Sequence, residues 1–201
     1  DGTYDWTKYT VLSQNLLDLK TKGYLNTDAL TAKYTDSAVA LAEGRAAFGF
    51  YGPFICEEAL KTNPDFNCGV MPIPSLVEGD QPTFAGGEMT TWGVWKDSKH
   101  VDAAIKLVNY FAQPENVKAV AESNKVPAGL TGVEVDAGYL TQYYTQYADL
   151  RTFTYFDRIY LPNGMWDVLC KNGQDVLAGG ITPEQATDNI AKEYARLRAS
   201  E

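Results

Sequence analysis

Short amphipathic helices alternate along this chain with short apolar segments that are bounded by glycine or proline. Apolar residues recur at helical spacing from Thr7 to Gly23, from Val101 to Phe111 and after Pro183. Between them, Ala46 to Tyr51 and Cys68 to Pro74 have the composition of short strands. This alternation is typical of α/β layers. No Gly/Ser-rich linker or internal repeat divides the chain, so we predict an α/β fold without an internal domain boundary.

Helix starts are marked by local sequence. Gly52-Pro53 should end one strand and begin a helix, because proline is favoured at the first helical position. Thr182-Pro183-Glu184-Gln185 is an N-terminal capping signature for the last helix. Further helices are expected over Ser37 to Glu43, after Gln113-Pro114, and over Met165 to Leu177, and a strand over Met89 to Trp95.

The segment from Tyr139 to Tyr160 is rich in aromatic residues. Tyr139 to Leu150 fits a helix with Tyr143 and Tyr147 on one face, where rings normally fill a core. From Tyr155 on, rings alternate with Asp157 and Arg158 just before a turn-forming sequence. We therefore expect some of these later rings to lie at the surface near a cleft.

Charge and length exclude several classes of function. The chain has 201 residues and a net charge of −9, which opposes binding to nucleic acids or anionic membranes. No stretch approaches the roughly 20 apolar residues that span a bilayer, so the chain shown is expected to be soluble. It opens on Asp1-Gly2-Thr3, which is neither a start methionine nor a signal peptide, and we expect an excised piece of a longer protein.

The sequence offers little for catalysis or metal binding. His100, the single histidine, lies among charged residues, so a nucleophilic triad has at most one candidate base. Cys56, Cys68 and Cys170 lack C-x-x-C spacing and a nearby histidine, which argues against zinc. Cys56 and Cys68 could pair if their segments meet, but scattered cysteines are equally compatible with buried thiols. We expect no metal and no cofactor.

Two chemistries remain open from the residues alone. Carboxylates among Glu57, Glu58, Glu88 and Asp157 could converge as acid and base on a glycosidic bond, although solvated carboxylates are the plainer interpretation. Aromatic rings beside hydrogen-bonding side chains instead suit recognition of sugars, because a pyranose has an apolar face and an equator of hydroxyls.

Eight short patterns occur in a fixed order over about residues 5–194. They are Glu43 to Phe54, Asn63 to Asp65, Gly69 to Pro74, Gly86 to Glu88, Ala104 to Phe111 with Pro114-Glu115, Val126 to Ala128, Trp166 to Gly180, and Thr182 to Ala186. In this order the chain resembles the extracellular solute-binding proteins of ABC transporters for sugars and oligosaccharides, which are related to maltose-binding protein.

The resemblance implies an α/β fold of the periplasmic-binding-protein-like type II, with two lobes that close on the ligand. Residues 1–97 and 130–201 would belong to the C-terminal lobe, and a segment of about 98–129 to the N-terminal lobe. The chain would then be mostly a C-terminal lobe carrying half a binding site.

The resemblance also implies which residues bind the ligand. Phe54 occupies the position of a tryptophan that stacks on sugar, and Trp166 matches a second stacking tryptophan. Phe54 keeps a stacking face but lacks the indole N–H donor. Gly87 and Glu88 stand where relatives bring backbone and a polar side chain to the ligand. The weaker candidates are Tyr51, Tyr155 and Tyr160.

By the same resemblance we expect a monomeric transport protein, without catalysis, that binds a mono- or oligosaccharide and delivers it to permease subunits. It would act outside the cell, as a cell-surface lipoprotein or in the periplasm. Two alternatives stay open: a glycan-processing enzyme with paired carboxylates, and a sensor or interaction domain with the same fold.

Overall fold

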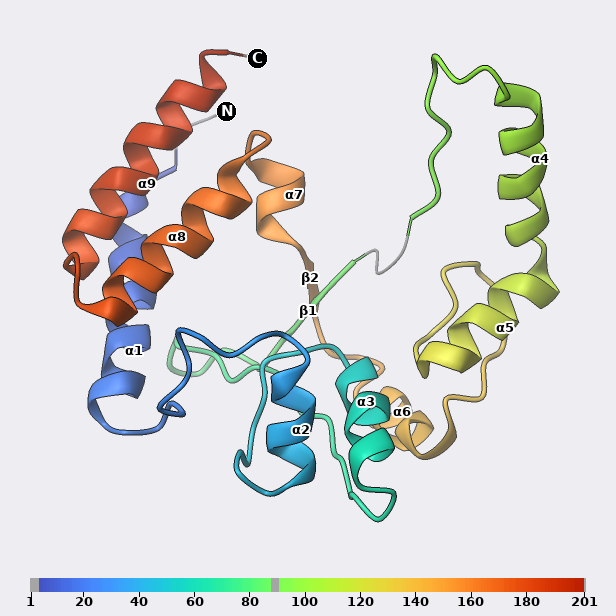
Figure 1. Ribbon diagram of the computed structural model, residues 1–201, viewed down its shortest axis with the longest axis horizontal. Helices are drawn as coiled ribbons and strands as arrows, with labels where there is room; N and C mark the ends of the chain where they lie inside the picture. The colour runs from blue at the N-terminus through green and yellow to red at the C-terminus, as the bar shows by residue number, and fades with distance from the viewer. Residues whose placement is uncertain (1–3, 88–90, 201) are drawn as a thin grey trace. The chain divides into compact units, whose positions relative to one another are not determined.

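The computed structural model describes residues 4–87 and 91–200. The chain divides into two compact units, one made of Asp1–Lys33 with Thr154–Glu201 and the other of Tyr34–Phe153. Figure 1 shows the elements of each unit. No helix in the described ranges is both long enough and apolar enough to cross a membrane.

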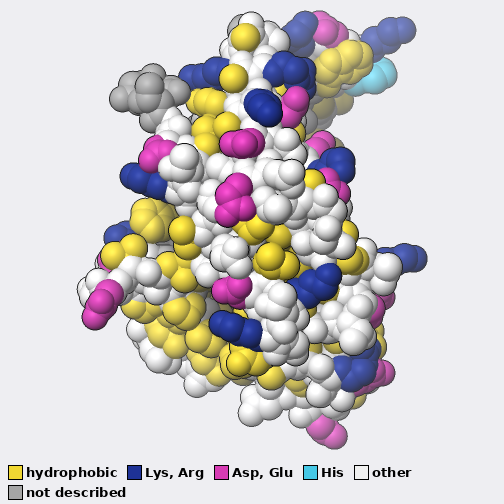
Figure 2. Space-filling view, turned by 90° about the vertical axis from the view of Figure 1, so that its left-hand side faces the viewer, with side chains coloured by type: hydrophobic (Ala, Val, Ile, Leu, Met, Phe, Trp, Pro, Cys, Tyr) yellow, Lys and Arg dark blue, Asp and Glu magenta, His cyan; other side chains and the backbone are white. Residues whose placement is uncertain are grey.

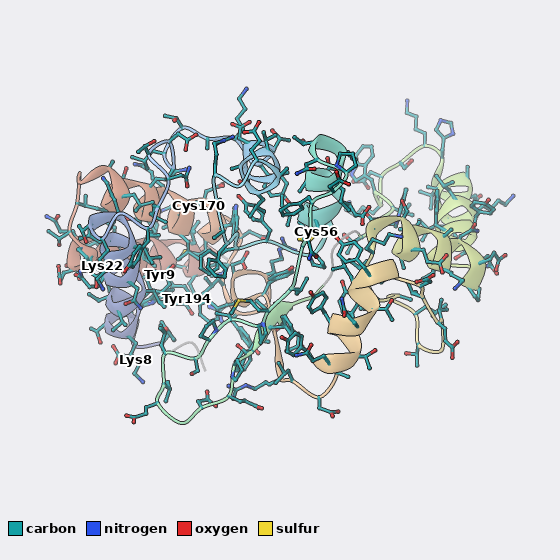
Figure 3. All side chains as sticks on the ribbon, turned by 90° about the horizontal axis from the view of Figure 1, so that it is seen from below. Lys8, Tyr9, Lys22, Cys56, Cys170 and Tyr194 are labelled. Carbon is teal, nitrogen blue, oxygen red and sulfur yellow. A yellow bond between two sulfur atoms is a disulfide. The ribbon has the colours of Figure 1, made fainter. Side chains whose placement is uncertain are left out.

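The first unit is helical. Its elements are η1 (Trp6–Tyr9), α1 (Thr10–Thr21), α7 (Phe156–Tyr160), α8 (Met165–Ala178) and α9 (Pro183–Arg198). Helices α1, α8 and α9 pack against one another (Figure 1). Their core is a cluster of Trp6, Met165 and Ile190. The ring of Tyr194, which is labelled in Figure 3, lies beside Trp6 with ring centroids 5.3 Å apart.

The last helix begins where the sequence predicts. The Thr182 hydroxyl accepts a hydrogen bond from the backbone N–H of Gln185, and the Gln185 side chain accepts one from the backbone N–H of Thr182. This reciprocal pair is a capping box. Ala186 and Ile190 are buried, as the helical spacing predicts.

On the face shown in Figure 2, basic and acidic side chains are interspersed, so the negative net charge forms no single patch there.

The second unit contains helices and a strand. They are α2 (Asp36–Ala42), α3 (Phe54–Thr62), β1 (Phe84–Gly86), α4 (Val101–Phe111), α5 (Pro114–Asn124), η2 (Gly138–Leu140) and α6 (Thr141–Gln146). Strand β1 pairs with β2 (Thr152–Thr154) in a two-stranded sheet. Helices α2 and α3 pack together over a core that includes Leu41 and Ile55.

A disulfide between Cys56 and Cys68 completes this core (Figure 3). It joins the first turn of α3 to the segment that follows this helix. Both cysteines are buried among Ala38, Leu41 and Ile55. Of the two states that the sequence left open for Cys56 and Cys68, the structure has the paired one, and Cys170 is a free, exposed cysteine.

Three predicted strands are wrong in this structure, as far as the described residues extend. Ala46 to Tyr51 is irregular, Cys68 to Pro74 makes only one antiparallel bridge, from Ile73 to Thr83, and the described part of the third segment, 91–95, contains no strand. A strand exists only where a neighbour satisfies its backbone N–H and C=O groups. Apart from β1, β2 and that bridge, no described segment supplies such a neighbour.

Two predicted helices have features that the sequence did not show. The helix predicted over Tyr139 to Leu150 is shorter in the structure: it consists of η2 and α6 and ends at Gln146. Helix α4 has the predicted range but buries none of its residues, and Trp92 stacks on its Phe111 with ring centroids 4.3 Å apart. The predicted division into lobes stays a prediction, because the two units are compact groups of contacts and do not by themselves identify lobes.

Candidate functional site

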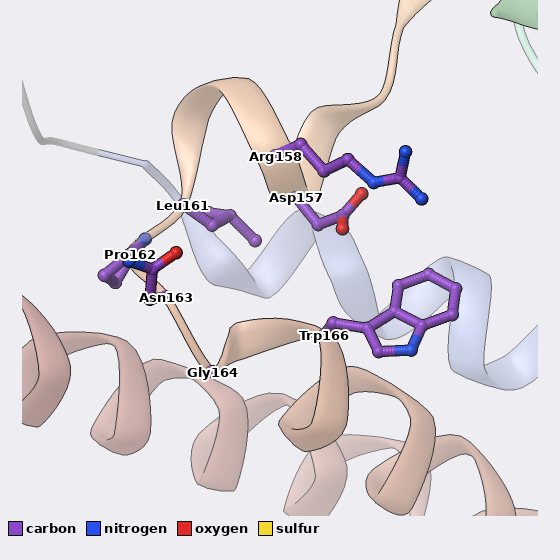
Figure 4. Close-up of a pocket in the computed structure, with 7 residues that line it drawn as sticks. All are labelled: Asp157, Arg158, Leu161, Pro162, Asn163, Gly164 and Trp166. Atoms are coloured by element: carbon purple, nitrogen blue, oxygen red, sulfur yellow. The ribbon is translucent and has the colours of Figure 1, made fainter. Parts of the chain in front are cut away.

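A pocket of about 310 Å³ lies in the first unit, between α7 and the start of α8 (Figure 4). Ligand pockets in proteins generally span about 300–1,000 Å³, so this one is at the lower end of that range. We call it the Trp166 pocket. Its lining residues are Asp157, Arg158, Leu161, Pro162, Asn163, Gly164 and Trp166.

Trp166 borders this pocket because its neighbours fix the start of α8. Gly164 is the N-cap residue with a φ of 93°, a left-handed conformation that favours glycine. Met165 is fully buried against Trp6 and Ile190. The next helical residue points about 100° away, since a helix turns once in 3.6 residues. Trp166 is accordingly 59% exposed and free to present its indole ring.

Helix α7 supplies the charged wall of the Trp166 pocket. In Figure 4 the Asp157 carboxylate and the Arg158 guanidinium lie on the same side of the pocket as the Trp166 indole. The Arg158 guanidinium carbon stands 4.6 Å from the ring centroid of Tyr155, a cation–π contact. The pocket therefore combines a flat ring with hydrogen-bond acceptors and donors, which is what recognition of a polyol requires.

The cysteine on α8 is not set up as a nucleophile. Burial raises the pKa of the Cys170 thiol, and the negative charges of Asp167 and Asp157 raise it further. A thiol with a raised pKa is protonated at neutral pH and is a weak nucleophile.

A second group of aromatic side chains lies in the other unit. We call Tyr34, Tyr51 and Phe54 the α3 ring cluster. The ring of Tyr34 stacks with that of Phe54 at a centroid distance of 6.2 Å and an interplanar angle of 27°. Tyr34 also meets Tyr51 edge-on, with centroids 5.3 Å apart and an angle of 73°. Offset-stacked and edge-to-face geometries are the favourable ones for aromatic pairs.

Small residues and one hydroxyl position the α3 ring cluster. A Cβ on Gly52 would be 2.4 Å from Cε1 of Phe54, so the Phe54 ring lies directly against this glycine. A Cβ on Gly49 would be 3.1 Å from Cδ2 of Tyr51. The Tyr51 hydroxyl is 2.5 Å from the Ser37 hydroxyl in the first turn of α2. Local backbone and α2 thus hold the rings in place.

The structure brings together some of the predicted site residues. Tyr51 and Phe54 share the α3 ring cluster, whereas Trp166 and Tyr155 are linked through Arg158 in the first unit. Gly87 follows β1 and is exposed. Glu88 lies outside the described residues.

The carboxylate pair of the alternative hypothesis is not assembled within either unit, as far as the described residues go. Glu57 and Glu58 are consecutive on α3, so their side chains leave the helix in different directions. Glu58 forms an ion pair with Lys61 at 2.5 Å. Asp157 belongs to the other unit. Among the described residues there is also no group of three or more His, Cys, Asp or Glu that could hold a metal.

Sequence reasoning missed Tyr34 and did not assign Arg158 to a site. Tyr34 contacts Tyr51 and Phe54, which are remote in sequence, so periodicity could not reveal it. Tyr34 lies two residues before the start of α2, and no sequence pattern marks it as a partner of these rings.

Residues 1–118 match the family described as bacterial extracellular solute-binding protein. This chain belongs to that family. It is 37% identical over 198 residues to the melibiose/raffinose/stachyose-binding protein MelE of Bacillus subtilis, covering 98% of this chain and 46% of MelE. The resemblance predicted from the ordered motifs is thereby confirmed.

Solved structures agree with this assignment. A sugar transporter protein of Bacillus licheniformis, solved in complex with stachyose, is 40% identical with a TM-score of 0.88, covering 98% of this chain and 51% of that chain. The binding protein MsmE of Bacillus subtilis, solved in an open conformation, is 37% identical with a TM-score of 0.84, covering 99% and 50%. The predicted fold class is confirmed, and the chain spans about half the length of these relatives.

Proposed function

We propose that this protein binds an oligosaccharide outside the cell and delivers it to the permease subunits of an ABC transporter. The ligand would be of the kind named for its relatives: melibiose, raffinose or stachyose. The observation that carries the proposal is the Trp166 pocket, in which an exposed indole lies on the same side as a carboxylate and a guanidinium. An aromatic platform with polar groups at its edge matches the apolar face and hydroxyl equator of a pyranose.

The proposed role is binding without catalysis. The Cys170 thiol has a raised pKa, and neither unit assembles the expected carboxylate pair among its described residues. The ligand would leave unchanged, as transport requires. The family description supports an extracellular location. A lipid anchor in a cell-surface protein, or residence in the periplasm, and a monomeric state are parts of the same proposal.

Calorimetric titration of the full-length protein with melibiose, raffinose, stachyose and glucose tests this function. We expect saturable binding of at least one oligosaccharide, with chromatography showing the sugar intact afterwards. Trp166→Ala should weaken binding about 30-fold or more, the usual cost of removing a central aromatic contact. Trp95→Ala is the matched control, because Trp95 is 71% exposed and does not line the Trp166 pocket.

Three results would count against the proposal. Absence of binding to every sugar would remove carbohydrate as the ligand class. Release of smaller sugars during the titration would favour the glycan-processing alternative. Equal losses in Trp166→Ala and Trp95→Ala would remove the Trp166 pocket from the binding site.

A further inference from the structure

The exposed member of the α3 ring cluster is a residue that the sequence did not single out. Tyr34 is 56% exposed and Tyr51 is 40% exposed, whereas Phe54 is half-buried. The Phe54 ring contacts the backbone of Gly52 and stacks with Tyr34. Of the stacked pair, Tyr34 therefore presents the larger free ring surface.

The hydroxyl groups of the cluster are also unequal. The Tyr51 hydroxyl shares a hydrogen bond with the Ser37 hydroxyl, which fixes the orientation of the Tyr51 ring. Burial raises the pKa of the Tyr34 phenol, and Tyr51 and Glu58 add to the rise. Tyr34 therefore keeps its proton at neutral pH and has a hydrogen-bond donor to offer at the rim of an aromatic surface.

The charge near the cluster selects the kind of ligand. The acidic side chain that acts on Tyr34 is Glu58, at the exposed side of α3. Glu58 is paired with Lys61 at 2.5 Å, so the charge beside the rings is balanced and favours neither an anionic nor a cationic ligand. A stacking face and a phenol donor beside a balanced ion pair together fit a neutral saccharide.

We propose that Tyr34 is a ligand-contacting residue, on whose exposed ring a pyranose unit stacks while Phe54 supports that ring by stacking with it. This inference rests on the proposed function and extends it by a residue that no motif of the chain marks. It differs from the expectation that Phe54 is the ring in direct contact with sugar, since Phe54 becomes the supporting residue.

The test is a calorimetric titration of the full-length protein and its variants with stachyose. Tyr34→Ala should weaken binding about tenfold or more, whereas Tyr34→Phe, which keeps the ring, should stay within about threefold of the parent. Tyr24→Ala is the control, because Tyr24 is 74% exposed and belongs neither to the α3 ring cluster nor to the lining of the Trp166 pocket. Thermal melts of all variants accompany the titrations.

A fluorescent variant separates contact from support. In Tyr34→Trp the new indole should change its emission on saturation with stachyose, beyond the change seen in the parent. The inference is overturned, and the proposed function left intact, if stachyose changes the emission of Tyr34→Trp no more than that of the parent. The same holds if Tyr34→Ala binds stachyose as tightly as the parent. Failure of the parent to bind any of the sugars tested above overturns the proposed function and this inference with it. If Tyr34→Ala melts at a lower temperature than the parent, its affinity no longer separates a lost contact from lost stability. The emission of Tyr34→Trp then decides whether Tyr34 contacts the sugar.

Discussion

The ring of Phe54 lies against the backbone of Gly52, where a Cβ would come within 2.4 Å of Cε1 and 2.8 Å of Cδ1. Any side chain on residue 52 must displace this ring, and with it the stack on Tyr34. Gly52→Ala should therefore weaken sugar binding by the value of one aromatic contact, about 0.5–1.5 kcal/mol, or roughly twofold to thirteenfold. Calorimetric titration with stachyose measures the loss.

Gly129→Ala is the matched control for Gly52→Ala. A Cβ on Gly129 would meet no atom within 4 Å, so this substitution tests the general effect of exchanging a loop glycine. We expect its sugar affinity to equal that of the parent. If the two variants bind stachyose equally well, the position of the Phe54 ring has no bearing on binding.

The Cys56–Cys68 disulfide should stabilise the fold around α3. It closes a loop with a sequence separation of 12, for which chain-entropy arguments give about 3 kcal/mol. We expect the double variant Cys56→Ala/Cys68→Ala to lose about that much free energy of unfolding in urea titrations. Cys170→Ala, which removes the exposed free thiol, should remain close to the parent. Equal stability of the double variant and the parent would show that the disulfide contributes nothing.

Features set by adjacent residues were predictable from the sequence. The start of α9 is specified within Thr182-Pro183-Glu184-Gln185, and the start of α3 by Gly52-Pro53, so both helices lie where they were expected. The exposure of Trp166 follows in the same way from its place at the start of α8, next to buried Met165, whereas its contact with a ligand stays a prediction.

Features that depend on remote partners were not predictable. Ala46 to Tyr51 has the composition of a strand, but no described segment pairs with it, and Phe48 and Phe50 remain exposed. Tyr34 is part of an aromatic cluster only because the fold brings Tyr51 and Phe54 to it. Composition shows which residues are able to form strands or sugar contacts, and the fold decides which of them meet.

The capping box of α9 gives a prediction that is independent of ligand. Thr182→Ala removes the hydroxyl that accepts from Gln185 N–H and should cost about 1 kcal/mol of unfolding free energy, within the 0.5–2 kcal/mol range of such substitutions. Thr182→Ser keeps the acceptor and should retain most of the stability. Urea titrations followed by circular dichroism measure both. A serine variant as unstable as the alanine variant would mean that the Thr182 methyl group, and not the cap, is responsible.

Tyr144 should make stability depend on pH in the alkaline range. Its hydroxyl donates a 2.8 Å hydrogen bond to the carbonyl oxygen of Lys125, the residue that closes α5. Burial raises the pKa of Tyr144 to about 12, with Tyr139 adding to the rise. The free phenol titrates near 10, so the fold favours the protonated form. Its contribution is therefore complete below about pH 10 and is lost as the pH rises from about 10 towards 12.

Tyr144→Phe isolates this contribution, because the other tyrosines are the same in both proteins and cancel in the comparison. Below pH 10 the parent should be more stable by about 1 kcal/mol, the net value of one hydrogen bond. Between about pH 10 and 12 this difference should shrink, since deprotonation then favours the unfolded parent. Urea titrations at a series of pH values measure it, in a Cys170→Ala background so that no free thiolate attacks the disulfide. A difference that stays constant from pH 8 to 12 would mean that Tyr144 titrates alike in the folded and unfolded chains.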